Sequence, residues 1–84
     1  MRHLYALTSQ EHRVLVLVMK GLRNAKIARE MGISVRTVDN HLYHIFDKIG
    51  AASRTEAVFL ALSTGLITNA ELREVSYDLE DQPA

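Results

Sequence analysis

Apolar side chains recur along this chain at intervals of three and four residues. The clearest run consists of Val35, Val38, Leu42, Ile45 and Ile49. Positions with this spacing fall on one face of a helix with 3.6 residues per turn. No segment shows the two-residue alternation that is typical of a strand. The pattern therefore predicts an all-α fold, a small domain of four helices.

Residues that are typical of helix starts and stops divide the first half of the chain into two predicted helices. Thr8-Ser9-Gln10-Glu11 reads as a capping box, in which Thr8 and Glu11 each bind the other's backbone N–H, and Gly21 is a natural stop. Val14, Leu15, Leu17 and Val18 form a wide apolar stripe in this first helix. A second helix is predicted from Asn24, which can cap it, to Met31.

The later helices are delimited in the same way. Ser34 caps a third helix over residues 35–49, and Gly50 ends it. Ser53-Arg54-Thr55-Glu56 is a second capping box, and it opens a fourth helix that stops near Gly65.

The second and third helices are separated only by the turn Gly32-Ile33-Ser34. Two helices joined by so short a turn, with glycine in it, form a helix-turn-helix. The turn pushes the second helix outward, where it can enter the major groove of DNA.

The outer face of residues 35–49 is rich in groups that form hydrogen bonds. It carries Arg36, Asn40, Tyr43, His44 and Asp47, with Thr37, His41 and Lys48 on one flank and Asp39 on the other. Arg36 suits guanine and Asn40 suits adenine, while Tyr43 suits a thymine methyl group or a phosphate. Any exposed amphipathic helix has a polar outer face, however, so this face alone is weak evidence.

Phosphate contacts position a protein on DNA without reading its sequence. We expect them from Asn24, Lys26, Ser34, Thr37, His41, His44, Lys48 and Arg54.

Charged residues are distributed unevenly along the chain. The net charge of the 84 residues is zero. Residues 1–65 hold nine Lys/Arg and five Asp/Glu, which gives a net charge of +4. Residues 66–84 hold one Arg and five Asp/Glu, which gives a net charge of −4. A basic body with an acidic tail suits a nucleic-acid partner.

The chain has no cysteine, which excludes disulfides and thiolate metal sites, and it has no apolar run long enough for a membrane span.

Catalytic and metal sites receive little support. His41 and His44 lie three residues apart, but only Asp47 is a further possible ligand, so we expect no metal and no cofactor. The chain contains neither a nucleophile elbow nor a glycine-rich phosphate loop. An enzyme is not expected.

Much of the chain resembles the LuxR/FixJ/GerE helix-turn-helix family, in register and without gaps over about residues 7–66. The matching segments are Leu7-Thr8-Ser9-Gln10-Glu11, Val14-Leu15, Gly21-Leu22, Asn24-Ala25-Lys26-Ile27-Ala28, Gly32-Ile33-Ser34, Arg36-Thr37-Val38-Asp39-Asn40-His41, Ile45-Phe46-Asp47-Lys48-Ile49-Gly50 and Ser53-Arg54-Thr55-Glu56-Ala57. So many ordered matches are a specific signal.

The resemblance implies a four-helix domain over residues 1–66 that regulates bacterial transcription, followed by an acidic extension over 67–84. It implies backbone contacts at Lys26, Thr37 and Lys48 and a base contact at Asn40. The positions of Asp39 and Tyr43 often carry a lysine in that family. Asp39 therefore either accepts a hydrogen bond from cytosine or holds another side chain in place.

The resemblance also sets expectations for partners and location. The family usually joins this domain to a receiver or sensing domain, so the chain is either a stand-alone regulator or an excised domain. We expect double-stranded DNA as the partner, RNA polymerase as a further one, no membrane, and a place in the bacterial cytoplasm at the nucleoid. The alternative is a protein-interaction module that binds a sensor, an anti-activator or a polymerase subunit.

The fourth helix is apolar all round. If Ala57, Leu60 and Ala61 pack on the core, then Val58, Phe59 and Leu62 are exposed unless something covers them. Either a second copy of the chain covers them, giving a two-fold dimer, or the acidic tail does so.

Two alternatives remain open for the acidic tail. Thr68 to Glu71 could cap a short fifth helix with Leu72, Val75 and Leu79 as its stripe, or the tail is largely disordered.

Overall fold

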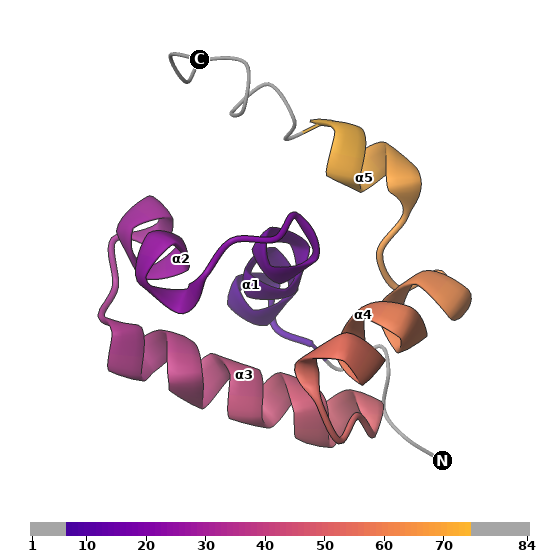
Figure 1. The fold of residues 1–84 in the computed structure, drawn as a ribbon, viewed down its shortest axis with the longest axis horizontal. Helices are drawn as coiled ribbons and strands as arrows, with labels where there is room; N and C mark the ends of the chain where they lie inside the picture. The colour runs from indigo at the N-terminus through magenta and orange to yellow at the C-terminus, as the bar shows by residue number, and fades with distance from the viewer. Residues whose placement is uncertain (1–6, 75–84) are drawn as a thin grey trace.

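The computed structural model describes residues 7–74, and all regular structure in that range is helical (Figure 1). The elements are α1 (Ser9–Met19), α2 (Asn24–Met31), α3 (Val35–Ile49), α4 (Arg54–Ser63) and α5 (Asn69–Glu74). The prediction of an all-α fold is confirmed. Within the described residues, no helix combines the length and the apolarity needed to cross a bilayer.

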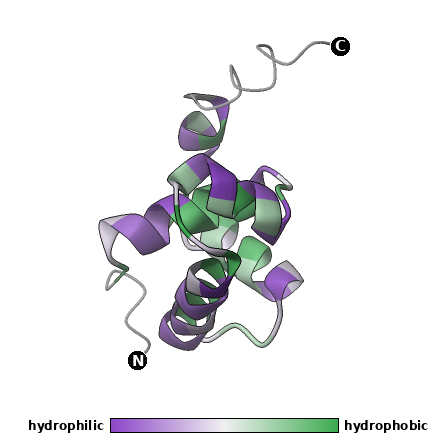
Figure 2. Ribbon diagram, turned by 90° about the vertical axis from the view of Figure 1, so that its left-hand side faces the viewer, coloured by the Kyte–Doolittle hydropathy of each residue, from purple (hydrophilic) through white to green (hydrophobic). Residues whose placement is uncertain are grey.

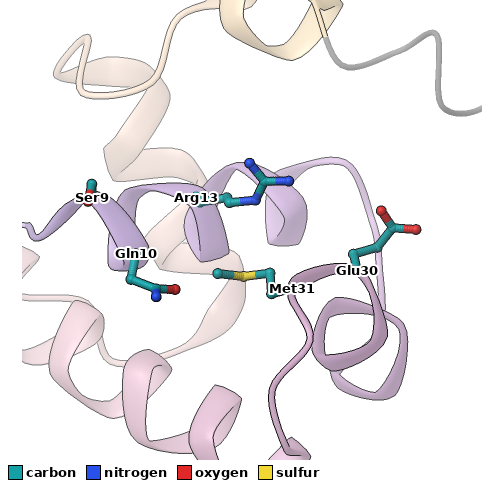
Figure 3. A pocket seen from close by; sticks show the side chains of 5 residues that line it. All are labelled: Ser9, Gln10, Arg13, Glu30 and Met31. Atoms are coloured by element: carbon teal, nitrogen blue, oxygen red, sulfur yellow. The ribbon is translucent and has the colours of Figure 1, made fainter.

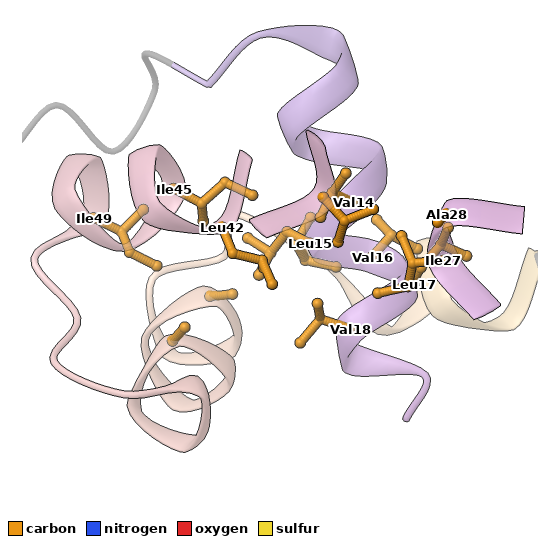
Figure 4. Close-up of a cluster of buried hydrophobic side chains, with 14 residues drawn as sticks. Val14, Leu15, Val16, Leu17, Val18, Ile27, Ala28, Leu42, Ile45 and Ile49 are labelled. Carbon is orange, nitrogen blue, oxygen red and sulfur yellow. The ribbon is translucent and has the colours of Figure 1, made fainter. Parts of the chain in front are cut away.

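Helix α1 lies at the centre of the fold and packs against each of the other four helices. Its five successive residues from Val14 to Val18 are all buried, although the sequence predicts only a stripe of four (Figure 4). Val16 is buried too, because α1 packs against each of the other four helices, and its exposed residues Ser9, Gln10 and Arg13 lie in its first half. Burying side chains of this size stabilises a fold by about 1.5–3 kcal/mol each.

The predicted cap of α1 is present in full. The Thr8 N–H donates to Glu11 Oε1 at 2.9 Å, and the Glu11 N–H donates to Thr8 Oγ1 at 3.1 Å. At α3, Ser34 Oγ accepts the Thr37 N–H at 3.0 Å, as predicted.

The caps of α4 and α2 differ from the prediction. Ser53 Oγ accepts the Glu56 N–H, but Glu56 Oε1 binds the N–H of Ala52 instead of that of Ser53. At α2, the N-cap is Arg23, without a side-chain bond, and Asn24 is the first helical residue. The prediction that Asn24 caps α2 is wrong, because its amide is bound to other side chains.

The turn between α2 and α3 depends on Gly32, whose φ of 68° lies in the left-handed region. A residue with a side chain is strained there, whereas glycine is not. The turn is therefore encoded locally, and it sets the angle at which α3 leaves α2.

The residues that follow α4 belong to the same core. Ile67 is completely buried, and Leu72 of α5 packs against the core cluster. Thr68 and Glu71 form a reciprocal cap at the start of α5, so the predicted short fifth helix is observed over Asn69–Glu74. Val75 and Leu79 lie outside the described residues. The division of the chain after residue 66 thus does not coincide with the edge of the core.

Candidate nucleic-acid interface

Helix α3 lies along one side of the described part of the molecule (Figure 1). Val38, Leu42, Ile45 and Ile49 are buried as predicted, and hydrophobic segments gather toward the middle of the molecule (Figure 2). Val35 differs from the prediction, since 44% of it is exposed in the first turn, where fewer neighbours surround the helix. The predicted polar face, Arg36, Asn40, Tyr43, His44 and Asp47, is exposed.

The centre of this face carries an aromatic pair. Tyr43 is 70% exposed, more than the other exposed large hydrophobic residues described, and its ring meets the His44 ring edge to face at 5.4 Å between centroids. An exposed aromatic ring at such a site suits contact with a flat or methyl-bearing surface.

One flank of α3 is tied to α2 and α4 through a chain of side-chain hydrogen bonds. Asn24 Nδ2 donates to Asp39 Oδ1 at 2.8 Å, and Arg54 Nη1 donates to Asn24 Oδ1 at 2.9 Å. Arg54 Nη2 also donates to the Leu22 carbonyl at 2.8 Å. Three residues that the sequence assigns to DNA therefore hold the start of α2, α3 and α4 together.

The opposite flank of α3 is tied to the start of α1. Lys48 Nζ donates to Glu11 Oε1 at 2.7 Å, and only 5% of Glu11 is exposed. Burial raises the pKa of Glu11, but the bonds from Lys48 and from the Thr8 N–H, with the charges of Lys48 and His41, leave that pKa below the ordinary value of 4.5. Sequence reasoning missed this ion pair, because 37 positions separate its partners.

The remaining predicted phosphate ligands are placed as follows. Ser34 Oγ and Thr37 Oγ1 share a hydrogen bond of 2.9 Å at the start of α3. Lys26 and His41 are half-buried, and His44 is exposed. Among residues 7–74, no three His, Asp or Glu side chains gather as metal ligands would.

The outer surface of α4 carries an exposed apolar patch, Phe59 and Leu62, which are 65% and 44% exposed. Ala57 and Ala61 are fully buried, as predicted. Val58 differs from the prediction, because it is half-buried and packs against the core. Leu60, expected on the core, is only half-buried and is not among the residues packed against the core. The predicted exposed apolar surface thus loses Val58.

Two further features involve residues of α1. An open cavity of about 450 Å³ is lined by Ser9, Gln10, Arg13, Glu30 and Met31 (Figure 3). His12 Nε2 lies 2.6 Å from Glu71 Oε1, which joins α1 to α5. No local pattern in the sequence singles out His12, because its partner Glu71 lies 59 positions further on.

Comparison with known proteins places the chain in a family. The pattern for GerE, "Bacterial regulatory proteins, luxR family", matches residues 5–61. The chain is 47% identical over 62 residues to the transcriptional regulatory protein YdfI of Bacillus subtilis, covering 74% of this chain and 29% of YdfI. It is 39% identical over 61 residues to the oxygen regulatory protein NreC of Staphylococcus aureus, covering 73% of this chain and 28% of NreC.

Comparison with solved structures supports the same family. The fold is similar to that of the VqmA dimer of Vibrio cholerae, a LuxR-type receptor, with a TM-score of 0.70 and 38% identity over 80% of this chain and 32% of VqmA. The chain thus spans less than a third of each of these three relatives. It shares with them the helix-turn-helix of transcriptional regulators rather than an enzyme fold, and it belongs to the luxR family of bacterial regulatory proteins.

Proposed function

We propose that this chain binds double-stranded DNA in a sequence-specific manner and that α3 enters the major groove. The observation that carries the proposal is the division of α3 into a buried apolar face and an exposed face of hydrogen-bonding side chains, directly after a glycine turn. An α-helix fits the width of the major groove, and its outer side chains can then reach base edges.

The proposed base contacts come from the middle of the exposed face. Arg36 donates two hydrogen bonds to guanine, Asn40 pairs with adenine, and Tyr43 packs on a thymine methyl group. Asp39 lies beside them and is the fourth proposed base contact.

The proposed phosphate contacts surround the base contacts. Thr37 and His41 lie on one flank of α3, His44 lies on its outer face, and Lys26 lies on α2. Ser34 acts through Thr37, to which it is bonded. The bonds of Asn24, Arg54 and Lys48 within the domain hold these groups in place, and this lowers the cost of ordering them when DNA binds.

The regulatory context follows from the relatives. YdfI and NreC are named as regulators, and VqmA is described as a dimer with a target DNA. We infer that this chain acts in transcription at the bacterial nucleoid as a two-fold dimer joined through Phe59 and Leu62, with RNA polymerase as a further partner. The second candidate function is a protein-interaction module, which the exposed apolar patch on α4 favours.

In vitro selection from random duplexes at fixed salt tests DNA binding. Enrichment of a two-fold-related motif is expected, with an affinity that falls steeply with salt by about 0.9 log unit per log unit of salt for each phosphate neutralised. Asn40→Ala should lose specificity more than overall affinity, and Asn69→Ala, the same change on α5, should leave both unchanged. A protein-interaction module would enrich no motif and bind no duplex.

A further inference from the structure

Asp39 brings a formal negative charge to the edge of a face that is proposed to meet DNA. Its side chain is exposed, and its bond comes from the neutral amide of Asn24. Arg54 binds the oxygen of that same amide instead of the Asp39 carboxylate. The Arg54 guanidinium therefore orients Asp39 indirectly, through the Asn24 amide.

The orientation of the Asn24 amide is fixed by this arrangement. Arg54 only donates hydrogen bonds, so the atom of Asn24 that faces Arg54 must be its oxygen. The Asn24 nitrogen must then face Asp39. Arg54 also donates to the Leu22 carbonyl, which holds its guanidinium in place. Arg54 therefore donates to Asn24, and Asn24 in turn donates to Asp39. Asp39 Oδ1 is thereby occupied, and its rotamer is held while Oδ2 remains available as an acceptor.

A carboxylate held in this way distinguishes the four bases by their groove edges. It can only accept, and in the major groove only the amino groups of cytosine and adenine donate. Guanine presents two acceptors there, thymine presents one, and adenine places its N7 acceptor beside its amino group. Cytosine is the base without an acceptor next to its donor.

We propose that Asp39, positioned by Asn24, is a specificity-determining residue that selects cytosine at one position of each half-site. The inference rests on the proposed DNA binding and adds to it the identity of one base. Asp39 favours a base edge over the backbone, since a carboxylate repels phosphate.

Parallel selections with four proteins at one salt concentration test this inference. The wild-type chain should enrich cytosine at one position, and replacing that cytosine by guanine should weaken binding about tenfold. Asp39→Asn should change the enriched base from cytosine to adenine, because a carboxamide pairs with the adenine edge. Asn24→Ala should reduce the discrimination at that position, and it should also lower the affinity for all duplexes, because the bonds of Asn24 help to hold the phosphate-contacting groups in place. Glu30→Gln, which removes an equal charge from the exposed side of α2, should keep the wild-type motif.

The outcomes separate the two proposals. If wild type and Asp39→Asn enrich the same motif, Asp39 does not read a base, and the inference is overturned while DNA binding stands. If the wild-type chain enriches no motif, the proposed function fails and the inference fails with it. Thermal unfolding of each variant shows that the folded domain is the species compared, and Asp39→Asn is expected to fold because the side chain is exposed.

Discussion

Lys48 Nζ lies 2.7 Å from Glu11 Oε1, so the last turn of α3 is joined to the first turn of α1. The Glu11 carboxylate also accepts the Thr8 N–H, and it is almost completely buried. One oxygen atom thus caps α1 and anchors α3. The position of α3 against α1 depends on this carboxylate as well as on the apolar core.

Glu11→Gln should lower the free energy of unfolding by about 2 kcal/mol, the usual range for a hydrogen bond to a charged group in a partly buried site. The amide keeps the shape of the side chain but loses its charge, so Lys48 faces a neutral group. Urea denaturation followed by circular dichroism measures the change. Glu30→Gln on the exposed side of α2 is the matched control and should change stability by less than about 0.5 kcal/mol. Equal stability of both variants would show that the ion pair contributes nothing.

The pH dependence of stability should follow from the same carboxylate. The pKa of Glu11 in the folded chain lies below its ordinary value of 4.5, so the unfolded chain binds the proton more readily than the folded chain. The stabilisation is present above pH 4.5 and is lost as the pH falls through the folded pKa. Glu71, whose pKa is lowered by its bonds to His12 and to the Thr68 N–H, acts in the same direction.

Unfolding free energies measured from pH 7 to pH 3 should therefore fall less steeply for Glu11→Gln than for the wild-type chain. Glu11→Gln and wild type should differ most at neutral pH and converge in acid. Parallel curves over the whole range would contradict a lowered pKa for Glu11 in the folded chain.

Leu62→Asp should give a monomer that binds its operator much more weakly. A charge in the middle of an apolar contact between two copies remains without a partner, and burying it costs more than the contact gains. Sedimentation equilibrium at the working concentration measures the association. Ser63→Asp adds the same charge to a neighbouring exposed position of α4 and serves as the control. Unchanged sedimentation of Leu62→Asp would remove α4 as the dimer surface.

The sequence predicts the features that depend on near neighbours along the chain. The caps at Thr8 and Ser34 and the turn at Gly32 each involve residues within a few positions of one another, so their chemistry is visible in order. The buried face of α3 is visible for the same reason, apart from Val35 at its exposed first turn.

What the sequence does not reveal depends on contacts between distant segments. Asn24 is a residue type that often caps helices, yet its amide binds Asp39 and Arg54, which lie 15 and 30 positions away. Glu11 reads as half of a capping box, and only the packing of α3 on α1 brings Lys48 to it. Side chains that look available for DNA are thus partly engaged within the domain, which no helical wheel can show.

Ile67→Ala tests whether the residues after α4 are part of the folding unit. The side chain is fully buried in the same core as Val14 and Ile45, so its removal leaves a cavity and should cost about 2–5 kcal/mol. Val35→Ala, at a position of α3 that is 44% exposed, also shortens an apolar side chain and should cost far less. Urea denaturation of the two variants gives the comparison. Equal losses would mean that residues beyond 66 contribute little to stability, whereas the expected difference would show that the domain needs Ile67 to close its core.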